Sequence, residues 1–153
     1  NCHIPAQEKN DASIDQEFSS LANVLKQRNY YSNFLVGGAL EYDNRHGFFL
    51  GQGYDNFYGR YDYGNDVFST VWGVADEHLF NKSFEILATN KHPTFMTILT
   101  LTNHPTYEFP QNDNIDPVAK ILPDQMRMNA FKYSDWALNE FMEKCVCLRP
   151  IFA

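Results

Sequence analysis

The stretch that decides the fold is an apolar run that ends in a short polar turn and a histidine, Phe95-Met96-Thr97-Ile98-Leu99-Thr100-Leu101-Thr102-Asn103-His104. Because residues 95–101 are apolar or β-branched at nearly every position, they predict a central strand that is covered on both faces. Residues 99–104 are therefore expected to continue as a buried strand that delivers His104 to the mouth of an anion-handling site. A loop histidine can be a proton donor, a metal ligand, an oxyanion partner or a structural residue.

Helical and strand patterns alternate along the rest of the chain. A helix capped by Ser13 or Asp15 is expected to run to about Arg28, and the aromatic segment 31–36 predicts a strand. The further predicted elements are a short helix over 43–50, a short strand over 54–57, a helix that begins at Asp76, and a helix over 127–144. The last helix is expected to bury Ala130, Tyr133, Ala137, Leu138 and Phe141. This order predicts an α/β fold, with a largely parallel sheet flanked by helices, in one domain over residues 1–153.

Composition excludes several classes of protein. Hydrophobic residues make up 44% of the 153 residues, which predicts a packed core. The formal charge is -7 and no Lys/Arg cluster occurs, so the basic surface that nucleic acid requires is missing. No apolar run approaches the roughly 20 residues that cross a bilayer. The three cysteines, Cys2, Cys145 and Cys147, lack a fourth ligand for zinc, and no metal site is expected in this chain.

Two loops are expected to leave the carboxyl ends of strands, where open parallel sheets bind ligands. One follows Val36 and carries Asn44 and Arg45, and the other carries His104. A guanidinium donates two parallel hydrogen bonds to a phosphate or a sulfate, so Arg45 is a candidate anion ligand, although an ordinary surface arginine would show the same spacing. His46 adjoins Arg45 and could share its role.

Four stretches, in order and in spacing, resemble one family. They are 20–28 with 43–55, then Trp72-Gly73-Val74-Ala75-Asp76-Glu77, then Leu99-Thr100-Leu101-Thr102-Asn103-His104, and finally Asn129-Ala130 with Tyr133-Ser134-Asp135-Trp136-Ala137-Leu138. Together they resemble the sulfatase-like catalytic domain of lipoteichoic acid synthases and related phosphoglycerol transferases, which belong to the alkaline phosphatase superfamily. The resemblance covers residues 17–144, and it implies that the chain forms part of such a domain.

The resemblance implies an enzyme that moves glycerophosphate from phosphatidylglycerol to a glycan or lipid acceptor. Such enzymes work on the extracytoplasmic face of the bacterial cytoplasmic membrane, and here the membrane anchor would lie outside this chain. They form a covalent phospho-threonine with the help of a divalent metal, typically manganese. By the same resemblance His104 is a catalytic residue, while Arg45 and its neighbour Asn44 bind substrate.

Some features of the family are missing. Lipoteichoic acid synthases place a tryptophan two residues before the arginine, where this chain has Asp43. The family's threonine nucleophile and metal-binding glutamate would lie upstream, and its Asp-His metal pair downstream. We therefore expect an internal part of a longer enzyme that is inactive alone and holds no metal.

Two other functions are compatible with the same residues. The same kind of site could hydrolyse a sulfate or phosphate ester. Alternatively, the chain could be a non-catalytic domain that binds an anionic glycan or lipid headgroup through Arg45 and the Tyr- and Phe-rich residues 54–63, although those aromatic residues are also typical of core and loop packing.

Overall fold

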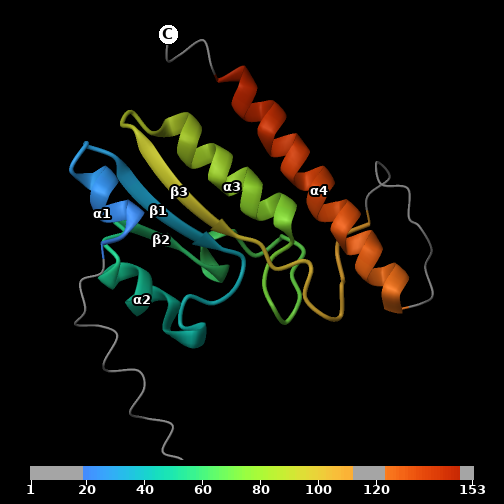
Figure 1. The fold of residues 1–153 in the computed structure, drawn as a ribbon. Helices are drawn as coiled ribbons and strands as arrows, with labels where there is room; N and C mark the ends of the chain where they lie inside the picture. Colours follow the sequence, from blue (N-terminus) through green and yellow to red (C-terminus); the bar gives the residue numbers. More distant parts are fainter. Residues whose placement is uncertain (1–18, 112–122, 149–153) are drawn as a thin grey trace, which may run out of the picture.

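The computed structural model describes residues 19–111 and 123–148, which form a small parallel sheet between helices (Figure 1). The elements in chain order are α1 (Leu21–Lys26), β1 (Tyr31–Val36), η1 (Tyr42–Asn44), α2 (Arg45–Gly51), β2 (Asn56–Tyr58), η2 (Arg60–Asp62), α3 (Asp76–Thr89), β3 (Thr94–Leu99) and α4 (Pro123–Cys147). The described sheet has the order β2-β1-β3, and both pairings are parallel. The predicted α/β class is confirmed.

The central strand of the described sheet is β1. Every residue of β1 after Tyr31 is buried, and Val36, its last residue, pairs with Leu99, the last residue of β3. Both strands therefore end at the same edge, as the site hypothesis requires. The prediction that residues 95–101 form the central strand is wrong for the described part of the chain, because β3 pairs there with β1 alone and its residues are half-buried or exposed.

Strand β3 is also shorter than predicted, and Asp76 supplies the reason. The backbone N–H groups of Leu101 and Thr102 both donate to Oδ1 of Asp76, at 3.1 and 3.2 Å. Donors that bind a carboxylate are lost to the strand ladder, so the chain leaves the sheet after Leu99. The prediction that residues 99–104 form a buried strand is therefore wrong: β3 ends at Leu99, and a loop follows in which Leu101 and Thr102 remain buried.

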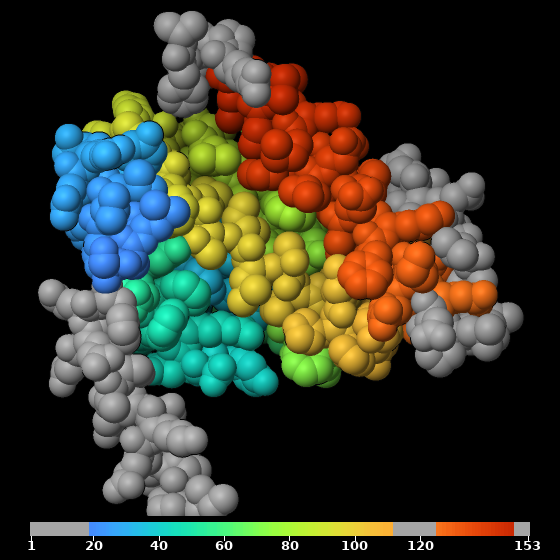
Figure 2. All heavy atoms as spheres, viewed as in Figure 1, coloured from blue at the N-terminus to red at the C-terminus, as the bar shows by residue number. Residues whose placement is uncertain are grey.

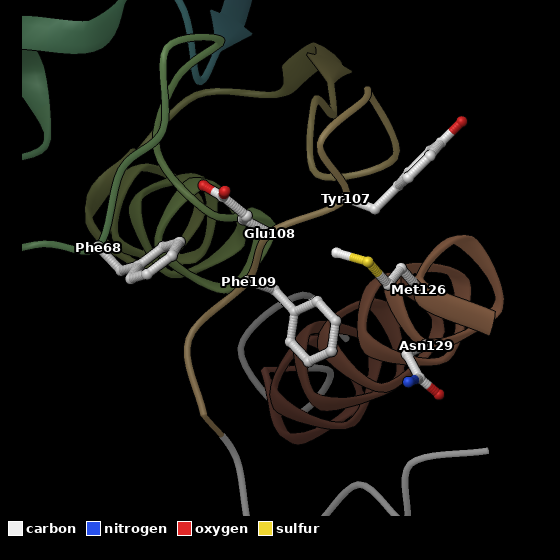
Figure 3. A pocket seen from close by; sticks show the side chains of 6 residues that line it. All are labelled: Phe68, Tyr107, Glu108, Phe109, Met126 and Asn129. Carbon is white, nitrogen blue, oxygen red and sulfur yellow. The ribbon is translucent and has the colours of Figure 1, made fainter. Parts of the chain in front are cut away.

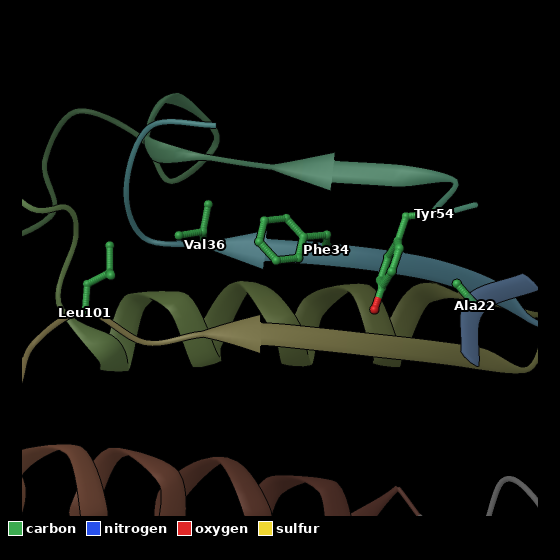
Figure 4. Close-up of a cluster of buried hydrophobic side chains, with 5 residues drawn as sticks. All are labelled: Ala22, Phe34, Val36, Tyr54 and Leu101. Atoms are coloured by element: carbon green, nitrogen blue, oxygen red, sulfur yellow. The ribbon is translucent and has the colours of Figure 1, made fainter. Parts of the chain in front are cut away.

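Helices cover both faces of the sheet. In Figure 1, α1 and α2 lie on one face, α3 lies on the other, and α4 packs on the outside of α3. The core between the sheet and α1–α2 holds Ala22, Phe34, Val36, Tyr54 and Leu101 (Figure 4). The ring of Phe34 stacks on Phe49 of α2 with centroids 4.0 Å apart, so the aromatic residues that the sequence places around residue 50 are chiefly packing residues.

Helix boundaries differ in detail from the predicted ones. Ser20 caps α1, since its hydroxyl accepts the N–H of Asn23 at 3.1 Å; the predicted caps Ser13 and Asp15 lie outside the described residues. The last helix is longer than predicted. It buries Ala130, Tyr133 and Ala137 as expected, but Leu138 is 44% exposed and does not face inward. No helix in the described ranges has the length and apolar character that a membrane span needs.

Candidate functional site

The loops that follow β1 and β3 meet at Gly38. A Cβ atom built there would lie 2.6 Å from the carbonyl oxygen of Trp72, 2.9 Å from Cδ1 of Leu101 and 3.5 Å from Nη1 of Arg45. Only glycine allows three segments to approach one backbone position so closely. The sheet edge where β1 and β3 end therefore gathers the arginine loop, the tryptophan loop and the segment that leads to His104.

The end of β1 is held in place by two further contacts. The Tyr63 hydroxyl donates to the Val36 carbonyl at 3.0 Å, and the N–H of Arg60 donates to the Gly38 carbonyl at 2.9 Å. Burial, assisted by the nearby Asp62 carboxylate, raises the pKa of Tyr63 above its ordinary value. The phenol therefore stays protonated, and remains a donor to Val36, at physiological pH.

His104 lies in the tight turn that follows β3, and its side chain is exposed. Its N–H donates to the Leu101 carbonyl at 3.1 Å, and its own carbonyl accepts the N–H of Tyr107 at 2.7 Å. The imidazole stacks on the indole of Trp72, with ring centroids 4.7 Å apart and an angle of 24° between planes. An exposed imidazole beside the converging loops is open to a substrate, which is what a proton-transfer residue requires.

Arg45 begins α2, and its guanidinium is half-buried. One nitrogen lies 3.5 Å from the carbonyl oxygen of Ala39, and the group stands over the ring of Tyr42, 4.8 Å from its centroid. These contacts hold the side chain beside Gly38 without an acidic partner among the described ion pairs. A guanidinium held this way retains hydrogen-bond donors for an anion.

The neighbours of Arg45 are placed differently. Asn44 has left-handed backbone angles, and its amide lies over Gly47 of the same helix, where Oδ1 is 2.5 Å from a built Cβ. That contact is local to the start of α2. His46 packs its ring against Phe57 with centroids 4.6 Å apart. The role of Asn44 as a substrate ligand stays a prediction. The ring of His46 contacts the aromatic residues that pack on the sheet.

A buried carboxylate ties the His104 loop to two helices. Besides the N–H groups of the loop, Asp76 accepts the Ser134 hydroxyl of α4 at 2.7 Å. The Asp76 N–H in turn donates to Thr102 Oγ1 at 3.0 Å, and Asn103 Nδ2 donates to Ser134 Oγ at 3.1 Å. Because Asp76 is completely buried, each of these bonds is worth more than it would be in water. The position of His104 therefore depends on α3 and α4.

Tyr133 contributes to this region through its ring. It is completely buried and stacks on Phe109 with centroids 5.0 Å apart. In the part of the chain that the structure describes, its hydroxyl has no hydrogen-bond partner. Burial, followed by the charge of Glu77, raises the pKa of Tyr133 above its ordinary value. Tyr133 is thus a neutral packing residue.

An open groove of about 400 Å³ follows directly on the His104 turn. Residues 107–109 of the loop line it on one side and Met126 and Asn129 of α4 on the other, together with Phe68 (Figure 3). Its lining is mostly aromatic or aliphatic, which suits an apolar group better than an anion.

The described residues do not fit a metal ion. Over 19–111 and 123–148, no three His, Cys, Asp or Glu side chains come together as a ligand set.

The sequence alone does not predict the roles of two residues near His104, Trp72 and Asp76. Trp72 is indicated only as a packed helix entry, and Asp76 only as an acidic residue that favours a helix N-terminus. Both residues lie in the segment 72–77, which is one of the stretches that resemble the family, and this is the sequence feature that could have indicated them. Their contacts to the His104 loop depend on tertiary packing, which spacing does not report.

The fold and the converging loops define an α/β protein whose candidate site lies at the carboxyl ends of parallel strands. The family model described as Sulfatase matches residues 3–145. The chain belongs to the sulfatase family.

Curated relatives make the resemblance more specific. The chain is 27% identical over 133 residues to the lipoteichoic acid synthase-like protein YvgJ of Bacillus subtilis (strain 168), a match over 85% of this chain and 22% of the relative. It is 28% identical over 137 residues to the lipoteichoic acid synthase of Staphylococcus saprophyticus, over 85% of this chain and 21% of that protein. The chain thus spans about a fifth of the length of these relatives.

Solved structures agree on the fold. A protein of the alkaline phosphatase superfamily from Vibrio parahaemolyticus matches with a TM-score of 0.74 and 36% identity, over 89% of this chain and 33% of the other. The lipoteichoic acid synthase LtaP from Listeria monocytogenes matches with a TM-score of 0.71 over 91% of this chain and 35% of the other, and at 23% identity it supports the fold alone. The predicted resemblance to lipoteichoic acid synthases within this superfamily is confirmed.

Proposed function

We propose that this chain is part of an enzyme that transfers phosphoglycerol from phosphatidylglycerol to a glycan or lipid acceptor. The proposal includes the setting that the resemblance implies, which is the extracytoplasmic face of the bacterial cytoplasmic membrane, with an anchor outside this chain. The chain alone would be inactive, because by the same resemblance the threonine nucleophile and the metal ligands lie outside it. The divalent metal, manganese by the resemblance, would be held by residues outside this chain.

One observation carries the proposal. The Arg45 guanidinium lies beside Gly38, at the edge where β1 and β3 end, and the exposed His104 imidazole stacks on Trp72, whose carbonyl oxygen also meets Gly38. Substrates of open parallel sheets bind at this edge. A tetrahedral phosphodiester needs a charged, directional donor for its non-bridging oxygens and a proton-transfer group near its ester oxygen. Arg45 and His104 are residues of these two types.

The proposed division of work follows from those residue types. Arg45 donates hydrogen bonds to the non-bridging phosphate oxygens and so orients the diester. As an oxygen nucleophile forms its bond to phosphorus, the bond from phosphorus to the diacylglycerol oxygen breaks. His104 donates a proton to that oxygen, so diacylglycerol leaves as a neutral alcohol. The apolar groove beside residues 107–109 suits an acyl group of the same lipid.

A second reaction class is favoured by the family itself. The matching model describes sulfatases, and an arginine fork binds sulfate in the same geometry as phosphate. Hydrolysis of a sulfate or phosphate ester is therefore the alternative.

The two reactions are separated by their products. The longer protein that contains this chain would be incubated with phosphatidylglycerol vesicles and, separately, with an aryl sulfate and an aryl phosphate. Transfer predicts diacylglycerol together with glycerophosphate attached to an acceptor. Free glycerophosphate or free sulfate as the main product would favour hydrolysis. Vesicle binding without turnover would instead support a non-catalytic headgroup-binding domain.

A further inference from the structure

Trp72 is the one side chain among the described residues that stacks on the His104 imidazole. Its indole N–H donates to the Pro105 carbonyl, next to His104 in the chain, and its backbone N–H donates to Thr70 Oγ1 at 3.2 Å. The ring is half-buried and packs against the hydrophobic core. The indole is thus held on one side by the core and is bound on the other to the turn that carries His104.

The backbone around Trp72 is fixed to the end of β1. The Trp72 carbonyl oxygen is 2.6 Å from a Cβ built on Gly38. The carbonyl carbon and oxygen of Gly37 are both 2.4 Å from a Cβ built on Gly73. In addition, the N–H of Val74 donates to the Gly37 carbonyl at 2.9 Å. The loop that presents the indole therefore cannot shift without moving the strand end beside which Arg45 lies.

We propose that Trp72 is a positioning residue of this site, which fixes the His104 imidazole relative to the Arg45 guanidinium. This inference rests on the proposed function, because it takes His104 as the proton-transfer residue. In the described ranges, the imidazole forms no hydrogen bond to another side chain. An exposed histidine with only backbone contacts would sample several rotamers. Stacking on a fixed indole selects one of them.

A positioning role makes a specific kinetic prediction. If the imidazole is displaced, proton transfer slows while the phosphate contact of Arg45 remains, so kcat falls and KM for phosphatidylglycerol changes little. A misplacement of about 1 Å can cost on the order of a hundredfold in rate, and Trp72→Leu should lower kcat about tenfold to a hundredfold. Trp72→Phe keeps an aromatic ring under the imidazole, so its kcat should stay close to that of the wild type.

The test uses the longer protein that contains this chain and measures diacylglycerol release from phosphatidylglycerol vesicles. The variants are Trp72→Leu, Trp72→Phe, His104→Ala and the double variant. Trp136→Leu is the matched control, because Trp136 is half-buried on α4 and packs on Tyr133 at 5.8 Å rather than on His104. Circular dichroism melting of each variant separates a loss of folding from a loss of position.

Coupling decides the outcome. If Trp72 acts through His104, Trp72→Leu has no further effect on kcat once His104 is alanine. Full additivity of the two losses, or the same loss in Trp72→Phe as in Trp72→Leu, would overturn the positioning role. If His104→Ala itself keeps wild-type kcat, the proposed function of His104 fails instead. If His104→Ala lowers kcat but Trp72→Leu retains the wild-type kcat, the proposed function stands and the inference about Trp72 is wrong.

Discussion

At the scale of single residues, the proposed site depends on the planar guanidinium of Arg45, whose paired donors an ammonium group lacks. Arg45 lies over Tyr42 and beside Gly38, and a planar group suits both contacts. A lysine would preserve the positive charge, but it would lose the paired donors that match two phosphate oxygens. Charge alone is therefore not expected to replace Arg45.

Arg45→Lys should raise KM for phosphatidylglycerol about tenfold or more, which corresponds to the loss of one charge-assisted hydrogen bond of about 1.5–3 kcal/mol. Vesicle assays over a range of lipid concentration would measure it. Arg127→Lys is the matched control, since Arg127 is exposed on α4 and stands over Phe131. Equal KM values for Arg45→Lys and the wild type would show that Arg45 is an ordinary surface arginine.

At the scale of elements, two carboxylates, the buried Asp76 and the half-buried Asp55, connect segments that local sequence patterns treat as separate. Asp76 joins the start of α3 to the loop after β3 and, through Ser134, to α4. Asp55 does the same at the other end of the sheet. It accepts the N–H and the hydroxyl of Ser32 at 2.9 and 2.8 Å and binds Lys26 at 2.6 Å.

Asp76→Asn should lower the free energy of unfolding by about 2–4 kcal/mol, because an amide cannot accept all of the hydrogen bonds from the loop and from Ser134. Urea unfolding at pH 7 would measure the change. Glu85→Gln on the exposed side of the same helix should change stability by less than about 0.5 kcal/mol. A similar small change in Asp76→Asn would mean that the loop is held by other contacts.

Asp55 predicts a dependence of stability on pH. Burial would raise the pKa of Asp55, but the hydrogen bonds from Lys26 and Ser32 outweigh it, and the pKa lies below its ordinary value. A lowered folded-state pKa stabilises the protein above the unfolded-state pKa of about 3.9, and this stabilisation is lost as the pH falls through the folded-state value. Asp55→Asn should therefore be about 1–3 kcal/mol less stable than wild type at neutral pH.

The measurement is urea unfolding of both proteins at pH 7 and at several values below pH 4. The difference between them should shrink as the pH falls. A difference that is constant over the whole range would contradict the role given to the Asp55 carboxylate.

The element scale also shows what the sequence could predict. Hydrophobic periodicity is local, so the strand over 31–36 and the helix that begins at Asp76 are predicted almost to the residue. The end of β3 is not predictable in this way. It depends on a carboxylate 25 residues earlier in the chain that takes the N–H of Leu101, and no local pattern reports that contact.

At the scale of the whole molecule, strand order is a property that local patterns do not report, and this explains why residues 95–101 were wrongly predicted to be the central strand. A run of apolar residues reports the tendency of a strand to be buried, and does not report which strand pairs with which. In the described sheet β1 takes the central place, because both β2 and β3 pair with it. That the loops after β1 and β3 leave the same edge was predictable, since it requires only that the two strands are parallel neighbours.

The described molecule also leaves an apolar stripe exposed on α4. Phe131, Leu138 and Met142 are each 44–52% exposed, and Figure 2 shows much of the α4 surface (orange to red) open on this face. Spacings of seven and four residues place them on one side of the helix. Exposed apolar side chains that share one side of a helix favour association.

We expect the isolated chain to self-associate through this stripe, as measured by sedimentation velocity over a range of concentration. Phe131→Lys with Leu138→Lys should shift it toward monomer, because both side chains are already in water and the substitution costs little stability. Glu143→Lys, also exposed on α4, controls for the change in charge. Self-association that the double substitution leaves unchanged would show that another surface is responsible.

The central claim is that the carboxyl edge of the sheet carries the chemistry, and one comparison of two histidines tests it most directly. His104 follows the carboxyl end of β3, whereas His92 precedes its amino end and packs on Tyr31 with ring centroids 4.9 Å apart. Diacylglycerol release from phosphatidylglycerol vesicles would be measured for His104→Ala and His92→Ala in the longer protein. We predict that His104→Ala lowers kcat about a hundredfold or more, while His92→Ala retains wild-type activity. Equal activity of the two variants would contradict the claim.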